Sequence, residues 1–407
     1  MRRESPYPMV PIEEAKRLIA AQANPLGEEV CDLLAPLAYG RILAEDVHAP
    51  DPIPDMPKSA VDGYAMQAAD GLNPRRVLAE LTAGKQSGVI LGPGEAVRIM
   101  TGAPIPPGAD AVIMVEQTEE QGGILTIGRS PKPGDSIHTI GQDVRQGELI
   151  LARGTVLGSA EIGLLATIGC TRARLFRRPK VAVLATGDEV FEPHGPVIPG
   201  GVRDSNRYAL LAAATEAGCE AISLGIARDD EATQRAAILH GLEQADVLLT
   251  SGGVSMGTRD LIKPLLAELG TVHFGRIAFK PGKPTTFATV GEKLIFGLPG
   301  YPVSSLVSFE VFVRPALRRL QGDATPERPS IRVVLGDPIH SSPDRPEYQR
   351  AVVRWQDGQL VAFSTGNQGS SRMLSLRGAN ALVHVPAGGG TFQPGQQLDA
   401  LLIGNLA

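Results

Sequence analysis

The chain has 407 residues, 43% of them hydrophobic, and a formal net charge of −5. This composition can bury sizeable cores, which excludes a largely disordered protein, and the length suggests two to three domains. The acidic balance and the 4% content of aromatic residues argue against nucleic-acid binding, which relies on basic patches and stacking rings.

We expect a cytoplasmic protein without a membrane span. No apolar run approaches the roughly 18 residues that a transmembrane helix needs, and the first residues lack the apolar segment of a secretory leader. The cysteines, Cys31, Cys170 and Cys219, lie far apart and show no metal-binding spacing. Reduced thiols in a reducing compartment are the simplest interpretation.

The first part of the chain changes its sequence pattern twice. Residues 8–45 have the apolar spacing of helical structure. Residues 49–142 contain short apolar runs separated by Gly-Pro turns, which predicts a small inserted β domain. Residues 143–178 return to mixed structure, with a helix expected over Ser159–Ile168 that Gly169 would end.

Residues 179–324 alternate between strand and helix patterns, which predicts a central α/β domain with a mostly parallel sheet. The expected strands are Lys180–Ala185, Ala221–Leu224 and Val247–Thr250; the expected helices follow Asp204-Ser205-Asn206, span Glu231–Leu242 and span Leu261–Leu269. Residues 325–407 have β patterns again and predict a C-terminal β domain, either a barrel or a sandwich. The fold class is therefore multidomain, α/β plus all-β.

The unusual loops of the α/β segment are expected at the carboxyl ends of its strands, where open parallel sheets bind ligands. Their convergence is a stronger signal than any one of them. The loops are Thr186-Gly187-Asp188-Glu189, Asp229-Asp230, Ser251-Gly252-Gly253-Val254-Ser255-Met256-Gly257, Lys280-Pro281-Gly282-Lys283-Pro284 and Leu298-Pro299-Gly300-Tyr301-Pro302-Val303-Ser304.

Two of these loops carry groups suited to oxyanions. Glycines and hydroxyls in the segment from Ser251 to Ser255 suit a phosphate, but the segment matches neither a Walker loop nor a dinucleotide fingerprint, and a plain turn fits equally well. Lys280 and Lys283 lie three residues apart on a proline-stiffened turn. That turn is either an oxyanion site or a surface turn with solvated lysines.

Three carboxylates, Glu189, Asp229 and Asp260, are candidate Mg²⁺ ligands, because this hard cation prefers oxygen donors. Helix capping is the competing interpretation for Asp229 or Asp230 and for Asp260. The histidines share no ligand spacing and no Gly-x-Ser-x-Gly motif occurs, so a zinc site and a serine hydrolase lack support.

Taken together, these motifs resemble the MoeA family of molybdopterin molybdenumtransferases, which is related to the E domain of gephyrin. The resemblance spans nearly the whole chain. Two positions depart from it: Tyr301 stands where many members have Asn, and Val61 where some have Met. Besides the loops above, the matching motifs are Ser59-Ala60-Val61-Asp62-Gly63-Tyr64-Ala65, Arg98-Ile99-Met100-Thr101-Gly102-Ala103, Asp204-Ser205-Asn206, Arg228-Asp229-Asp230 and Gln368-Gly369-Ser370-Ser371-Arg372.

The resemblance implies an enzyme that inserts molybdate into adenylylated molybdopterin and releases AMP with Mg²⁺, forming molybdenum cofactor. It implies a homodimer with elongated subunits, in which 1–48 and 143–178 form a helical linker and dimerisation domain. Contacts with other proteins of molybdenum-cofactor biosynthesis are also implied.

The site residues implied by the resemblance fall into three groups. The catalytic group is Asp62, Thr101, Glu189, Asp229, Asp260 and Lys280, with Asp62 and Thr101 acting in the partner subunit's site. The metal ligands are Glu189, Asp229 and Asp260. The residues that contact substrate or oxyanion are Ser251, Gly252, Gly253, Ser255, Lys283, Pro299, Pro302, Ser304, Arg350, Ser370 and Ser371.

Three other functions compete with this interpretation. The first is a molybdopterin adenylyltransferase of the same α/β fold, against which the long β segments argue. The second is a non-catalytic scaffold, and the third is an Mg²⁺-dependent nucleotide pyrophosphatase. AMP release without molybdate uptake would distinguish the last of these.

Overall fold

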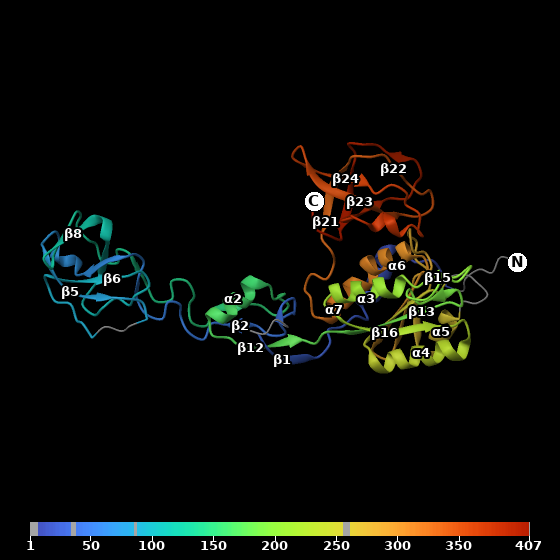
Figure 1. The fold of residues 1–407 in the computed structure, drawn as a ribbon, viewed down its shortest axis with the longest axis horizontal. Helices are drawn as coiled ribbons and strands as arrows, with labels where there is room; N and C mark the ends of the chain where they lie inside the picture. The colour runs from blue at the N-terminus through green and yellow to red at the C-terminus, as the bar shows by residue number, and fades with distance from the viewer. Residues whose placement is uncertain (1–6, 34–37, 85–87, 255–260, 407) are drawn as a thin grey trace. The chain divides into compact units, whose positions relative to one another are not determined.

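The computed structural model describes residues 7–33, 38–84, 88–254 and 261–406. The chain divides into two units, the first comprising Met1–Ala44, Gly154–Gly158 and Ala173–Ala407, and the second Glu45–Arg153 and Ser159–Arg172 (Figure 1). The finer division into four domains stays a prediction. Within the described residues, no helix combines the length and apolarity needed to cross a membrane.

A six-stranded sheet forms the centre of the first unit, in the order β16-β13-β17-β20-β19-β18. Its first four strands pair in parallel, and the β20-β19 and β19-β18 pairs are antiparallel, so the sheet is mixed with more parallel than antiparallel pairs. The strands are β13 (Lys180–Thr186), β16 (Glu220–Ala227), β17 (Val247–Ser251), β18 (Thr271–Phe274), β19 (Thr286–Val290) and β20 (Lys293–Leu298).

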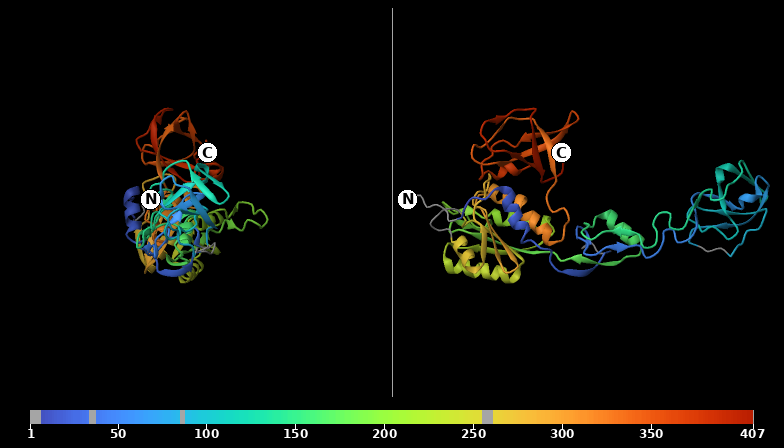
Figure 2. Two further views of the ribbon diagram at one scale, coloured as in Figure 1. Left: turned by 90° about the vertical axis from the view of Figure 1, so that its left-hand side faces the viewer. Right: turned by 180° about the vertical axis from the view of Figure 1, so that it is seen from behind.

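Helices cover both faces of this sheet, with α3 and α6 on one side and α4 and α5 on the other (Figures 1 and 2). Side chains of β13 alternate between the two cores: Val181 and Val183 pack into one, Ala182 and Leu184 into the other. Two buried faces explain why the strand is a continuous apolar run. The helices are α1 (Ile12–Ala20), α3 (Asn206–Glu216), α4 (Glu231–Gln244), α5 (Ile262–Leu269), α6 (Pro302–Ser308), the π-helix η4 (Phe309–Val313) and α7 (Arg314–Leu320).

The helical expectation for residues 8–45 is wrong beyond α1. Pro25 disfavours helical geometry at the residue before it, and the segment Glu28–Asp32 instead forms β1, which pairs with β12 (Arg172–Phe176). Helix α1 packs its apolar face, including Ile12 and Ile19, into the core on the α3 side of the sheet.

The C-terminal residues form a closed barrel in the order β21-β24-β23-β25-β27, so the barrel alternative is the one observed. Closure leaves no unpaired sheet edge. The backbone of the barrel also pairs with the segment 280–284, which we call the lysine turn. Lys280 N donates to Pro346 O at 2.9 Å, and Tyr348 N donates to Lys280 O at 2.8 Å. The strands are β21 (Ser330–Leu335), β23 (Glu347–Gln356), β24 (Gln359–Ser364), β25 (Ala381–Val385) and β27 (Gln397–Leu402), with β22 (Ile339–His340) paired to β26 (Thr391–Phe392) and the 3-10 helix η5 (Met373–Leu376) nearby in sequence.

The second unit contains a six-stranded sheet in the order β7-β4-β6-β5-β9-β8, as expected for an inserted β segment. Its helix α2 spans Ser159–Thr167 and is followed by Gly169 at a φ of 73°, which confirms the predicted helix and its stop. The remaining elements are β2 (Val47–His48), β3 (Lys58–Ser59), β4 (Gly63–Met66), η2 (Ala68–Asp70), β5 (Arg75–Leu81), β6 (Glu95–Ile99), β7 (Ala111–Met114), η3 (Val115–Gln117), β8 (Thr118–Gln121), β9 (Ile124–Ile127), β10 (Ile137–His138) and β11 (Leu149–Leu151).

An ion pair fixes the amino-terminal edge of the parallel strands. Asp246, just before β17, accepts hydrogen bonds from both terminal nitrogens of Arg177, at 2.9 and 2.8 Å, and from Lys180 N at 2.8 Å. Partial burial raises the pKa of Asp246, but the bonds from Arg177 and Lys180 outweigh it and hold the pKa below its ordinary value.

Replacing Asp246 with Asn should therefore lower the free energy of unfolding by about 1–2 kcal/mol at pH 7, a modest value because Arg177 is partly exposed. A depressed folded-state pKa stabilises the protein above the unfolded value of about 3.9, and the contribution is lost as pH falls through the folded value. Urea unfolding followed by circular dichroism should thus show that the difference in free energy of unfolding between the wild type and Asp246→Asn becomes smaller below about pH 4. A difference that stays constant with pH would contradict a charge-based role.

Candidate functional site

A cavity of about 800 Å³ lies at the carboxyl ends of β13, β17 and β20. Its volume is in the range of small-molecule sites. Every one of the five loops expected at this edge contributes at least one residue, and the barrel segment adds Ser371 and Met373. The predicted site residues in its lining are Glu189, Asp229, Ser251, Gly252, Gly253, Pro299, Pro302 and Ser371.

The glycine-rich loop after β17 packs against the loop after β13 at close range. Gly252 has a φ of 96°, and a Cβ placed there would lie 2.7 Å from Thr186 O. Glycine is thus required both by the backbone conformation and by the approach of the two loops. Ser251 is buried and its hydroxyl accepts a hydrogen bond from Asn206 Nδ2 at 2.7 Å. Ser255, in the same predicted loop, lies outside the described residues.

The carboxylates Glu189 and Asp229 line this cavity together. The absence of a side chain at Gly187, which has a φ of 140°, leaves room for the carboxylate of Glu189. A Cβ at position 187 would lie 2.8 Å from Glu189 Oε2. Asp229 is held in turn by Gln234, whose Nε2 donates to its Oδ1 at 3.2 Å.

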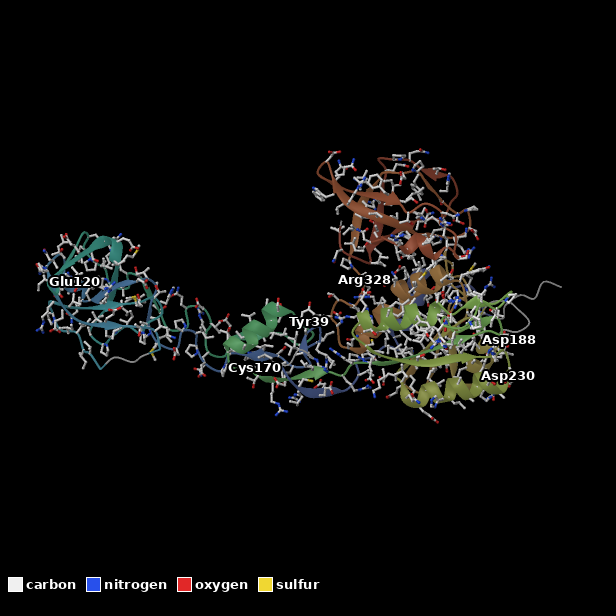
Figure 3. The ribbon with its side chains drawn as sticks, viewed as in Figure 1. Tyr39, Glu120, Cys170, Asp188, Asp230 and Arg328 are labelled. Carbon is white, nitrogen blue, oxygen red and sulfur yellow. The ribbon has the colours of Figure 1, made fainter. Side chains whose placement is uncertain are left out.

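The capping alternative belongs to Asp230, which accepts from Thr233 N at 2.8 Å and begins α4. Figure 3 labels Asp230 and Asp188 on the neighbouring loops after β16 and β13, which are joined by a bond from Asp229 N to Asp188 Oδ1 at 3.1 Å. Asp229 is therefore left as a cavity-lining carboxylate.

Two carboxylates facing one cavity suit Mg²⁺, which usually takes one or two of them together with substrate phosphates. A cluster of three or more potential ligands does not occur among the described residues. Asp260, the third predicted ligand, lies outside them.

The lysine turn lines a second cavity of about 370 Å³ beside the barrel. Pro284 lines both cavities. Lys280 Nζ contacts Glu347 Oε1 at 3.2 Å and donates to Ser342 Oγ at 2.7 Å. The predicted oxyanion residues in this lining are Lys280, Lys283, Ser304, Arg350 and Ser370.

Arg350 is the most deeply buried cation of the second cavity. Burial lowers its pKa to about 10, so the guanidinium keeps its charge at neutral pH. Its Nε donates to Ser375 Oγ at 3.1 Å and its Nη2 to Gly369 O at 3.3 Å. These bonds fix the charged group beside the cavity.

Asp62 and Thr101, predicted to act together, are neighbours within the second unit. Asp62 Oδ1 accepts from the backbone N of Thr101 at 2.7 Å and from its Oγ1 at 2.8 Å. Both bonds lower the pKa of Asp62, the backbone bond more than the hydroxyl bond. The carboxylate is therefore ionised down to a lower pH than an ordinary aspartate.

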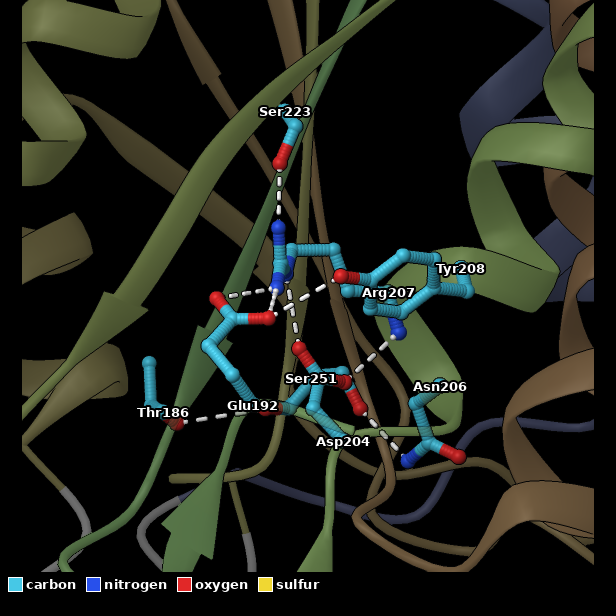
Figure 4. Close-up of polar contacts among 8 residues, drawn as sticks. All are labelled: Thr186, Glu192, Asp204, Asn206, Arg207, Tyr208, Ser223 and Ser251. Atoms are coloured by element: carbon cyan, nitrogen blue, oxygen red, sulfur yellow. Dashed lines mark hydrogen bonds and ion pairs between the residues drawn. The ribbon is translucent and has the colours of Figure 1, made fainter. Parts of the chain in front are cut away.

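Sequence reasoning assigned no role to the first turn of α3, yet its side chains hold the cavity loops (Figure 4). Asn206 Nδ2 donates to Ser251 Oγ and, at 2.8 Å, to Gly300 O. Arg207 binds Asp204 and Glu192. The available signal was the Asp204-Ser205-Asn206 motif, which was interpreted as a helix start and as a match to the family, but none of its residues was assigned to the site.

Comparison with known families matches three consecutive parts of the chain. The MoeA N-terminal region (domain I and II) covers residues 10–169, and a probable molybdopterin binding domain covers 182–319. The MoeA C-terminal region (domain IV) covers 332–403. These matches and the cavity at the sheet edge define a MoeA-type protein.

Similarity to individual proteins extends over the full length. Molybdopterin molybdenumtransferase of Bacillus subtilis is 36% identical over 97% of this chain and 94% of its own length. Gephyrin of Dictyostelium discoideum is 37% identical over 99% of this chain, which spans 63% of that longer protein. A solved MoeA structure from Pyrococcus horikoshii is 32% identical with a TM-score of 0.84, covering 98% of this chain and 100% of the other. The chain belongs to the MoeA family of molybdopterin molybdenumtransferases.

Proposed function

We propose that the chain inserts molybdate into adenylylated molybdopterin, with Mg²⁺-dependent release of AMP. Insertion of molybdenum into molybdopterin, a transferase activity of molybdenum-cofactor biosynthesis, follows from the family and the names of its curated members. The observation that carries the finer proposal is the pair of adjoining cavities, one with carboxylates and a glycine-rich loop, the other with cations.

The larger cavity has the volume and the groups for adenylylated molybdopterin. Ser251, Gly252 and Gly253 offer hydroxyl and backbone donors to phosphate oxygens. Glu189 and Asp229, together with Asp260 by prediction, would hold Mg²⁺, which neutralises charge on the phosphates when it is bound. The protein contributes position and electrostatic stabilisation, and no covalent intermediate with the chain is needed.

The smaller cavity has the charges for a tetrahedral oxyanion such as molybdate. Lys283 and Arg350 supply positive charge, while Ser304 and Ser370 supply hydroxyl donors. The positive charge of Lys280 is partly offset by Glu347. Molybdate bound here would sit next to Pro284, on the boundary with the larger cavity. There the two thiol groups of the pterin would bind molybdenum, and their two protons would leave with one oxo ligand as water.

The proposal also includes a cytoplasmic homodimer in which Asp62 and Thr101 complete the partner subunit's site. The support is the family resemblance and the presence of these residues in the second unit, whereas both cavities belong to the first. Enzymes that make adenylylated molybdopterin would supply the substrate.

The direct test combines purified protein, adenylylated molybdopterin, Mg²⁺ and molybdate, with AMP and cofactor-bound molybdenum both measured. We expect equal amounts of the two products, and a Glu189→Gln variant at least about tenfold slower, because an amide is a poorer Mg²⁺ ligand. AMP without molybdenum uptake would indicate a pyrophosphatase, and binding without turnover a scaffold. Synthesis of adenylylated molybdopterin from ATP would indicate an adenylyltransferase.

Replacing Lys283 with Gln tests the oxyanion cavity, because the change removes one charge-assisted contact while keeping a polar side chain. Such contacts contribute about 1.5–3 kcal/mol, so calorimetric titration should show molybdate affinity reduced roughly tenfold or more. Lys16→Gln on α1, where Lys16 pairs with Glu13, is the matched control and should bind molybdate normally. If Lys283→Gln binds molybdate as tightly as the Lys16→Gln control does, the lysine turn is a surface turn that does not bind the oxyanion.

Mixing Asp62→Asn subunits with Glu189→Gln subunits tests the dimeric site. If each site combines residues of both subunits, mixed dimers hold one intact site, and random exchange restores about a quarter of wild-type activity. Mass spectrometry verifies exchange, and each parent alone serves as the control. A mixture no more active than its parents would rule out a shared site.

A further inference from the structure

Arg207, in the first turn of α3, uses all three of its guanidinium nitrogens behind the wall of the larger cavity (Figure 4). Nε donates to Asp204 Oδ2 at 2.7 Å, and Nη2 donates to both carboxylate oxygens of Glu192, at 2.6 and 2.7 Å. Nη1 donates to Ser223 Oγ on β16. The side chain is only 6% exposed, so its charge is compensated by these partners rather than by water.

The two carboxylates that Arg207 binds lie at corresponding places on two short paired strands. Glu192 directly follows β14 (Val190–Phe191), and Asp204 directly follows β15 (Val202–Arg203). These strands supply Val190, Val202 and Arg203 to the cavity wall. Glu189 lies immediately before β14, so the segment that Arg207 holds is the one that carries this carboxylate.

The geometry requires an arginine. The planar guanidinium directs three nitrogens to three partners, with Nη2 at both oxygens of Glu192, Nε at Asp204 and Nη1 at Ser223, and a lysine ammonium, with one nitrogen, cannot reproduce this arrangement. Burial lowers the pKa of Arg207, but the bonds to Asp204 and Glu192 outweigh it and raise the pKa overall. The guanidinium of Arg207 therefore keeps its positive charge at neutral pH.

We propose that Arg207 is a positioning residue for the carboxylate of Glu189. By binding Glu192 and Asp204 together, it holds β14 and β15 against α3 and β16 and keeps Glu189 directed at the cavity. The inference rests on the proposed role of Glu189 as an Mg²⁺ ligand. It is independent of the lysine turn and of the smaller cavity, which Arg207 and its partners do not contact.

The test measures metal binding directly, with Mn²⁺ as a paramagnetic probe and AMP at saturating concentration, by loss of the free Mn²⁺ signal in electron paramagnetic resonance. The first variant, Arg207→Lys, removes the guanidinium that binds Asp204 and Glu192 together. The second, Glu192→Gln, removes the negative charge of a partly exposed side chain and keeps its shape. Groups that orient metal ligands typically contribute 10- to 100-fold to affinity, so we expect at least tenfold weaker Mn²⁺ binding in both.

The matched control is Asp323→Asn, which weakens a similarly buried ion pair with Arg318, at 2.6 Å, beyond the end of α7. It should lower thermal stability without changing Mn²⁺ affinity. Steady-state kinetics gives a second readout: the Arg207 and Glu192 variants should lower kcat and raise the Mg²⁺ requirement, while KM for molybdate stays unchanged.

Glu189→Gln separates this inference from the function on which it rests. If Glu189→Gln loses Mn²⁺ affinity but Arg207→Lys and Glu192→Gln keep it, Arg207 is purely structural and the inference is wrong. If Glu189→Gln binds Mn²⁺ as well as the wild type does, or the wild type does not bind it, the metal assignment fails and the positioning role fails with it. Reduced affinity in Asp323→Asn equal to that in the Arg207 variant would also overturn the inference, because general destabilisation would then explain it.

Discussion

The candidate site depends on one constraint, the parallel pairing of β16, β13, β17 and β20. Parallel strands bring their carboxyl ends to the same edge, so loops separated by more than a hundred residues in the sequence meet there. Both faces of the sheet are covered by helices, and polar groups therefore concentrate at the edges. The antiparallel strand β19 begins at this same edge, which brings the lysine turn beside the other loops.

The polar side chains at the start of α3 convert this meeting of loops into a defined cavity. Asn206 joins the loops after β17 and β20, and Arg207 joins the segments around β14 and β15. An N–H group that is removed from water without a hydrogen-bond partner destabilises the folded protein, so the bonds of Asn206 Nδ2 and of the Arg207 guanidinium favour one arrangement of the loops. Close approach at Gly252 completes the wall, because a side chain there would meet the backbone of Thr186.

Charge is divided between the two adjoining cavities. Carboxylates outnumber cations in the lining of the larger one, which includes Arg203, and cations outnumber carboxylates in the lining of the smaller one, which includes Glu347. A metal ion and an oxyanion need opposite charge in their surroundings, and the excess of carboxylates in one cavity and of cations in the other meets these two needs. Pro284 lies at the boundary and has no ionisable group to disturb either side.

The sequence by itself determined several elements of the α/β segment and helix α2, with their types. Apolar runs of the α/β segment located β13, β16 and β17, and Gly169 marked the end of α2, because these signals depend only on local spacing and conformation. It also identified five loops that would share one edge, since strand direction follows from the order of strands and helices.

Tertiary structure decided what local patterns leave open. Residues 28–32 became a strand because β12 offers a partner, although their neighbours have helical spacing. Asp230 rather than Asp229 caps α4, because the backbone of Asp230 is extended and its side chain accepts a hydrogen bond from Thr233 N. Packing between distant parts of the chain places most of the predicted oxyanion residues in a second cavity. It also brings Arg207 to its partners on three other segments. No local sequence pattern encodes such contacts, because the partners come together only when the sheet and the barrel are formed.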